Sequence, residues 1–186
     1  MATLAERMVG AARLDAGTYE EVEADTGATG QAALVVVISS ICLAIGRQVG
    51  AGVLGLVVLA LLMLLDWYVW ALVTYLIGTR LLPGAKTQAD VSQLLRTLGF
   101  ASAPGVVGVF GVIPGVGTAI NLLVWLWMVA AMVVAVRQAL DYDTTSRAVA
   151  VVVIGFLAYV VVGALFGALA ASLGGAPVAP VPPAGP

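Results

Sequence analysis

The chain has 186 residues, of which 62% are hydrophobic and only 10% charged, and its formal net charge is -2. A soluble domain is about 45–50% apolar and about 25% charged, so this composition excludes an ordinary soluble domain and indicates an integral membrane protein. Eight basic residues against ten acids form no basic surface, so we expect no nucleic acid partner.

Residues 1–30 form a polar segment in which charged and apolar residues alternate. Thr18 and Glu21 have the spacing of a helix capping box, so we expect a helix to start there. An apolar stripe before it suggests a second amphipathic helix: Leu4, Met8, Ala11 and Leu14. The acidic run that follows could accept contacts from a basic partner or could be a solvated helix face. Both interpretations stay open.

Five apolar segments follow, and a helix needs about 20 residues to cross a membrane core about 30 Å thick. The segments are 31–46, 51–77, 100–113, 118–136 and 148–173. The first and third are short, and Pro104 and Pro114 interrupt the third, so a re-entrant third segment is an alternative. Gly111 and Gly115 are spaced four apart, which predicts a close helix contact. We predict an all-α membrane domain of five transmembrane helices over residues 31–173.

The distribution of basic residues over the loops distinguishes the topology with five spans from the one with a re-entrant third segment. With five spans, one side holds seven of the eight basic residues and the other holds only Arg47. The seven are Arg7, Arg13, Arg80, Lys86, Arg96, Arg137 and Arg147. The positive-inside rule then predicts a cytoplasmic N-terminus, cytoplasmic loops at 78–99 and 137–147, and an external C-terminus. A re-entrant third segment would put Arg137 and Arg147 outside, so five spans agree better.

The segment before the third span is predicted to be an interfacial helix over 87–98. Thr87 and Asp90 have capping-box spacing, and apolar residues then recur at helical intervals: Val91, Leu94, Leu95 and Leu98. This helix leads directly into the third span, which Pro104 should kink. At the other end of the chain, residues 174–186 are rich in proline and uncharged, so we expect a disordered external tail.

The residue types argue against an enzyme. The chain has no histidine, one cysteine (Cys42) and no glycine-rich phosphate loop of the G-x-x-x-x-G-K type. Catalysis through histidine and histidine-ligated metal sites are therefore excluded, and nucleotide hydrolysis has no visible site. We expect no catalytic residue, no metal site and no cofactor.

Asp66 lies in the middle of the second apolar segment, where a charged side chain costs about 2.5–3.5 kcal/mol. It is either a protonatable group on a transport path or a buried acid that bonds within the bundle. We interpret Asp66 and Asn121 as the intramembrane polar residues. Further candidate partners of Asp66 at similar depth are Ser39, Ser40, Trp67 and Trp70.

One stretch, 94–117, resembles the Ypt-interacting protein (YIP) family. Members lead an amphipathic helix into a span through an L-G-[FY]-x-x-x-P pattern, here Leu98, Gly99, Phe100 and Pro104. The acidic "YEEVEAD" and the later "AVRQAL" also resemble bacterial members, and the resemblance covers about residues 5 to 172. It implies five transmembrane helices with a cytoplasmic N-terminus. Eukaryotic members associate with Rab GTPases and with one another, but this chain lacks their long N-terminal region, and bacteria lack Rab proteins.

These patterns favour a non-catalytic adaptor in a bacterial plasma membrane that organises proteins or lipids through its cytoplasmic face. The expected partners are membrane lipids and an unidentified membrane or cytoplasmic protein, with self-association left open. The alternatives are a small transporter or channel that uses Asp66 and a lipid-handling or membrane-shaping protein. The residues assigned to the cytoplasmic face are Glu20, Glu21, Glu23, Asp25, Arg96 and Arg137.

Overall fold

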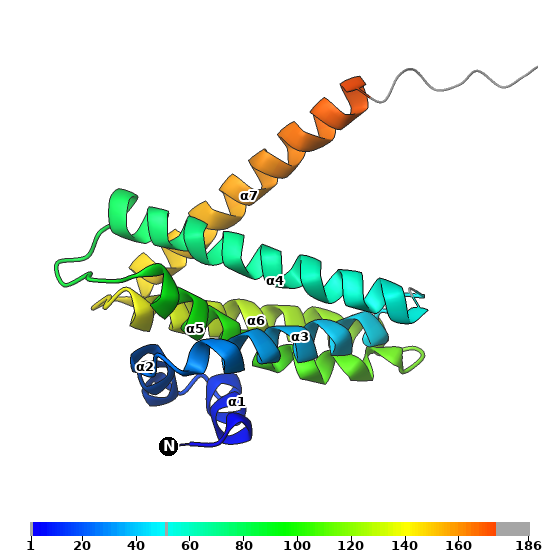
Figure 1. Ribbon diagram of the computed structural model, residues 1–186, viewed down its shortest axis with the longest axis horizontal. Coiled ribbons are helices and arrows are strands. Elements are labelled where there is room, and N and C mark those ends of the chain that lie inside the picture. Colours follow the sequence, from blue (N-terminus) through cyan, green and yellow to red (C-terminus); the bar gives the residue numbers. More distant parts are fainter. Residues whose placement is uncertain (1, 51, 174–186) are drawn as a thin grey trace, which may run out of the picture. The chain divides into compact units, whose positions relative to one another are not determined.

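The computed structural model describes residues 2–50 and 52–173, and every regular element in this part of the chain is a helix (Figure 1). The elements are α1 (Leu4–Ala12), α2 (Ala16–Ala24), α3 (Ala28–Gly46), α4 (Gly52–Leu76), the π-helix η1 (Ile77–Leu81), α5 (Val91–Ala101), the 3₁₀-helix η2 (Ala103–Val112), α6 (Gly117–Ala139) and α7 (Thr145–Leu173). The tail predicted over 174–186 lies outside the described residues.

Five stretches are long and apolar enough to cross a membrane. They are Ala28–Gly46, Gly52–Leu81, Val91–Val112, Gly117–Ala139 and Thr145–Leu165. This confirms the all-helical fold with five membrane-spanning helices. The chain divides into two compact units within α7, the first ending at Gly155. Among the described residues, the second unit contains only the remainder of α7, and the contacts described below belong to the first.

The third span is the centre of the first unit. Its two parts, α5 and η2, contact α3 and α6, and α5 also packs against α2 and α4. In Val91–Val112, 61% of the most apolar window is buried, against 33% or less in the other four spans. Protein therefore covers more of this span than of the other four, so irregular backbone is better tolerated in it.

The third span changes helix type beside Pro104, the residue at which the sequence predicted a kink. The α-helix α5 ends at Ala101, and Pro104, which has no N–H to donate, occupies the first turn of η2. A 3₁₀-helix rises about 2.0 Å per residue against 1.5 Å in an α-helix, so ten residues cover about 20 Å instead of about 15 Å. The short third segment gains length in this way.

Glycines spaced three apart along η2 explain its close packing. Residues i and i+3 share a face of a 3₁₀-helix, and Gly105, Gly108 and Gly111 follow this spacing. A Cβ atom on Gly108 would lie 2.5 Å from Cδ2 of Leu43 in α3, and one on Gly111 would lie 2.6 Å from Nδ2 of Asn121 in α6. Larger residues would force the helices apart.

Two predictions from glycine and cap spacing were wrong. Gly115 does not pair with Gly111 on a helix, because it lies in the turn before α6 with a left-handed φ of 81°. The helix predicted over 87–98 begins later, since Asp90 is the N-cap and shares a capping box with Gln93. Thr87 instead donates its hydroxyl to the carbonyl of Leu140, at 2.7 Å.

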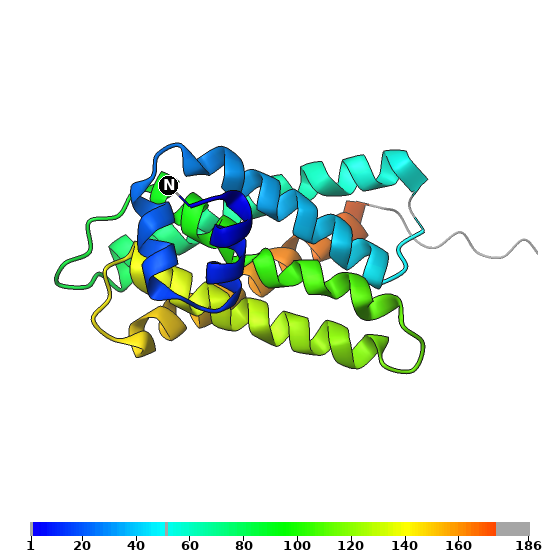
Figure 2. The same ribbon diagram turned by 90° about the horizontal axis from the view of Figure 1, so that it is seen from below.

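The N-terminal residues fold into two short helices that dock on one flank of the bundle (Figures 1 and 2). Thr3 and Glu6 form the capping box of α1. Asp15 is the N-cap of α2 and accepts from the backbone N–H of Thr18, so the predicted cap at Thr18 was wrong by three residues. The helix α2 contacts α5 and α6, and α1 contacts α2, α5 and η2. We call α1 and α2, with the first two turns of α5, the platform.

Two loops meet at the end of the bundle where α5 starts. The Tyr142 hydroxyl, after α6, donates to the carbonyls of Gly78 and Leu82, at 3.2 and 2.7 Å. Lys86 pairs with Asp143 at 3.2 Å. The turns after α3 and after η2 lie together at the opposite end, which we call the far end (Figures 1 and 2). The loops predicted to share the cytoplasmic side therefore do share one end of the bundle.

Candidate functional site

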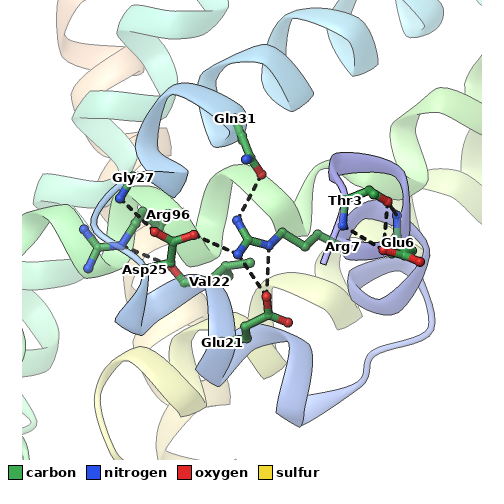
Figure 3. Close-up of polar contacts among 9 residues, drawn as sticks. All are labelled: Thr3, Glu6, Arg7, Glu21, Val22, Asp25, Gly27, Gln31 and Arg96. Atoms are coloured by element: carbon green, nitrogen blue, oxygen red, sulfur yellow. Dashed lines mark hydrogen bonds and ion pairs between the residues drawn. The ribbon is translucent and has the colours of Figure 1, made fainter. Parts of the chain in front are cut away.

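A buried arginine joins the three N-terminal helices (Figure 3). Arg7 of α1 is only 2% exposed. Its guanidinium donates to Glu21 Oε1 at 2.9 and 3.2 Å, to Asp25 Oδ2 at 2.7 Å and to Gln31 Oε1 at 3.0 Å. The hydrogen bond from Arg7, followed by one from the backbone N–H of Gly27, lowers the pKa of Asp25. Charged donors and acceptors make the strong hydrogen bonds in proteins, so this cluster fixes α1 and α2 to the start of α3.

A second buried arginine closes the C-terminal end of α2. Arg96 of α5 is 5% exposed, and its guanidinium donates to the carbonyls of Val22 and Glu23, with Nε at 3.1 and 2.9 Å. The last carbonyls of a helix lack intrahelical donors and carry partial negative charge, so a cation there is stabilising. Arg96, which the sequence assigned to the cytoplasmic face, is therefore enclosed beneath α2 instead of exposed on that face.

Glu23 lies between α2 and α5 among other charged groups. Its Oε1 accepts from Nε2 of Gln93 at 3.0 Å. Burial, followed by the charge of Asp141, raises the pKa of Glu23 to about 7, although Arg96 acts in the opposite direction; Glu20 and Asp90 raise it further. The platform therefore holds a carboxyl group that titrates near neutral pH.

The remaining platform contacts are apolar packing and single hydrogen bonds. Tyr19 and Val22 are fully buried, and burial raises the pKa of the Tyr19 phenol, whose hydroxyl donates to the carbonyl of Ala11 at 3.1 Å. Trp127 of α6 donates from its indole nitrogen to the carbonyl of Ala12 at 2.7 Å. Gln138 donates to Glu20 at 3.2 Å. All four acids of the predicted cytoplasmic face thus make contacts inside the chain.

Arg137 closes the turn between α6 and α7. It is half-buried, and its Nε donates to the carbonyl of Tyr142 at 3.3 Å. Its Nη1 lies 3.4 Å from the hydroxyl of Thr145. Arg13, Arg80 and Arg147 are exposed. The arginines that face solvent at this end are therefore different from the two that are buried beneath α2 and between the N-terminal helices.

The L-G-[FY]-x-x-x-P residues form the junction between α5 and η2. Leu98 is 5% exposed, and Phe100 and Pro104 are fully buried. A Cβ atom on Gly99 would lie 2.7 Å from the Cβ of Ala32 in α3. The motif therefore has a packing role, because it brings α5 against α3 and then ends the α-helix.

A family model, the Yip1 domain, matches residues 16–165. The chain belongs to the Yip1 domain family. The match runs from the first residue of α2 to the last residue of the fifth apolar stretch, and so includes the buried Arg96 and the motif at the α5–η2 junction. Nothing matches among the curated proteins or among the solved structures.

Asp66 and Asn121, the two polar residues predicted within the membrane, lie on different helices of this Yip1-family fold. Asp66 is half-buried in α4. Asn121 lies in the second turn of α6, where its Nδ2 donates to the carbonyl of Gly117 at 3.0 Å. Two candidate partners of Asp66 use their single donor elsewhere: Ser40 donates to Val36, and Trp67 donates to Leu95. Among the described residues, no group of three histidine, cysteine, aspartate or glutamate side chains could hold a metal ion.

The buried arginines were not recognised from the sequence as structural residues. Arg7 lies one turn before the buried Ala11, and Glu21 and Asp25 are one helical turn apart, a spacing that allows both to reach one guanidinium. Arg96 lies among apolar residues of α5, within a run from Leu94 to Ala101 in which only Leu95 is not buried. A charge on the apolar face of an amphipathic helix was the available signal.

Proposed function

We propose that this Yip1-family protein is a non-catalytic membrane adaptor that recruits another protein through the platform. The observation that carries the proposal is the enclosure of Arg7 and Arg96, because these two side chains hold α1 and α2 in one fixed position against the bundle. The positive-inside rule assigns this end of the bundle to the cytoplasm of a bacterial cell.

A fixed platform favours binding because little conformational entropy is lost when a partner docks. Glu20 is exposed, and the side chain of Glu21 is 42% exposed although one of its oxygens accepts from Arg7. These carboxylates suit a partner with a basic surface. The exposed Arg13, Arg80 and Arg147 lie at the same end, where each basic residue near anionic lipid contributes about 1 kcal/mol.

The test compares proximity labelling from the N-terminus in two arginine variants. Arg7→Met removes the guanidinium that joins α1 to α2 and α3, whereas Arg13→Met removes an exposed arginine from the same segment with the same change in charge. We expect Arg7→Met to lose the proteins labelled in wild type and Arg13→Met to keep them. Equal membrane abundance and helix content of both variants are required as controls.

Hydrogen exchange shows whether α1 and α2 are undocked in Arg7→Met. If they are undocked and the set of labelled proteins is unchanged, the platform is removed from the proposal. Lipid handling would then become the stronger function. A second variant, Glu20→Gln, keeps the shape of the platform and removes one exposed charge, so a partial loss of labelling there supports recognition of the acidic surface itself.

A further inference from the structure

A pocket of about 460 Å³ opens at the far end of the bundle. Its walls come from the end of α3, the turn after η2 and the start of α6, and they include Arg47, Gly111, Thr118 and Asn121. Ligand pockets are typically about 300–1,000 Å³. The pocket is separate from the platform, so its role does not depend on the adaptor proposal.

The pocket brings together donor groups that suit an anion. No hydrogen bond or ion pair within the described part of the chain holds the exposed Arg47 guanidinium. Thr118 contributes a hydroxyl, and the first turn of α6 has no side-chain cap. Oδ1 of Asn121 is buried without a donor among the described residues. Protein covers this oxygen, so a ligand in the pocket does not reach it, and Asn121 shapes the wall while its Nδ2 donates to the carbonyl of Gly117.

The position of the pocket indicates where such a ligand comes from. The chain leaves α3 at Gly46, leaves η2 at Val112 and enters α6 at Gly117, so three ends of membrane-spanning stretches border it. Helices that cross a membrane end near the headgroups. Apolar side chains next to the pocket are exposed, among them Val49 (49%), Ile113 (44%) and Val116 (47%), and they are available to acyl chains.

We propose that this pocket binds the phosphate-bearing headgroup of a membrane lipid, with Arg47 and Thr118 contacting the phosphate. The guanidinium suits a phosphate, because its planar array of N–H groups can donate two parallel hydrogen bonds. Under the predicted topology the lipid belongs to the external leaflet, where Arg47 is the one basic residue among the loops.

Native mass spectrometry of the full chain in detergent tests the proposal with three additives: phosphatidylglycerol, diacylglycerol and glycerol 3-phosphate. Wild type should retain one phosphatidylglycerol and no diacylglycerol, and equimolar glycerol 3-phosphate should not displace the lipid. Arg47→Gln should reduce the retained lipid about tenfold, the loss expected when a charge-assisted contact is removed. Thr118→Trp, which fills the pocket from an exposed position, should reduce it as well.

The control is Lys86→Gln, which also removes one exposed positive charge, at the other end of the bundle, and it should retain the lipid as wild type does. Equal retention in Arg47→Gln and wild type would overturn the proposal. So would retention of diacylglycerol at the level of phosphatidylglycerol, which would indicate apolar contact alone. Displacement by glycerol 3-phosphate would overturn the lipid source and assign the pocket to a soluble phosphate compound.

Discussion

Replacing Arg96 by methionine should release α2 from the bundle without unfolding the membrane-spanning helices. Methionine keeps an unbranched, flexible side chain that can follow the arginine stem, so packing beneath α2 changes little. The substitution removes the guanidinium that donates to the carbonyls of Val22 and Glu23. Both carbonyls lie at the C-terminal end of α2, where intrahelical donors are lacking.

The expected loss follows from the contacts of Arg96. A hydrogen bond to a charged group contributes about 1.5–3 kcal/mol, and a cation at a helix C-terminus adds about 0.3–1 kcal/mol. The two carbonyls share one guanidinium, so these contributions do not add fully, and the free energy of docking α2 should fall by about 2–4 kcal/mol. Since about 1.4 kcal/mol is a factor of ten, amides in Ala16–Ala24 should exchange roughly 30 to 900 times faster.

Hydrogen exchange with mass spectrometry in detergent or nanodiscs measures this effect directly. Peptides from α2 should lose protection in Arg96→Met, while peptides from the middle of α6 keep it. Arg13→Met is the control, because this arginine is exposed and has the same charge. Unchanged protection of α2 in Arg96→Met would show that apolar burial of Tyr19 and Val22 alone holds the helix, and the argument from the arginine would be wrong.

Four further predictions use separate parts of the molecule. Folding raises the pKa of Glu23 from an ordinary value of 4.5 to about 7, so between these values the folded state binds a proton that the unfolded state has lost. Docking of α2 should therefore weaken as the pH rises from about 4.5 to 7. Hydrogen exchange measures this pH dependence, and Glu23→Gln should flatten it. Gly108→Val should destabilise the bundle by about 1–3 kcal/mol because the new side chain overlaps with Leu43. Val107→Ala, at an exposed position, should cost less than about 0.5 kcal/mol. Thermal unfolding in detergent compares the two variants, and equal unfolding midpoints would contradict the packing argument. Asp66→Asn should keep the wild-type midpoint, whereas Asp66→Leu should lose about 1–3 kcal/mol because it cannot hydrogen-bond; loss of an ion or proton flux in a stable Asp66→Asn would favour transport instead. Reporter fusions after residues 85 and 142 should both report the cytoplasm and one after 186 the outside, and an external signal at 142 would exclude the five-span topology.

The number and order of membrane spans could be predicted because hydropathy and helix length depend on residues close together in the sequence. The helix caps could not be predicted in the same way. Thr87 with Asp90 and Asp90 with Gln93 both fit the capping-box spacing, and the choice depends on the hydrogen bond from Thr87 to Leu140, 53 residues later. A pattern that spans four residues cannot contain that contact.

The site was harder to predict than the fold, for a related reason. Loop charges correctly grouped Arg7 and Arg96 at one end of the bundle, but an arginine that faces lipid headgroups and one enclosed by protein look alike in a count of charges. Arg96 reaches carbonyls 73 and 74 residues earlier in the chain, and Arg7 reaches Gln31 on the third helix. Their burial follows from the docking of α1 and α2, which one sequence does not reveal.

The three-residue glycine period of η2 limits how this segment can change during evolution. Substitutions at Val107 and Phe110, which point away from the glycine face and are 37% and 56% exposed, should be accepted readily. A single inserted or deleted residue would turn everything beyond it by about 120°, since a 3₁₀-helix has three residues per turn. Gly108 and Gly111 would then leave Leu43 and Asn121, and valine or phenylalanine would take their place. Relatives that keep this helix should therefore vary in residue type between 103 and 112 but keep its length at ten residues.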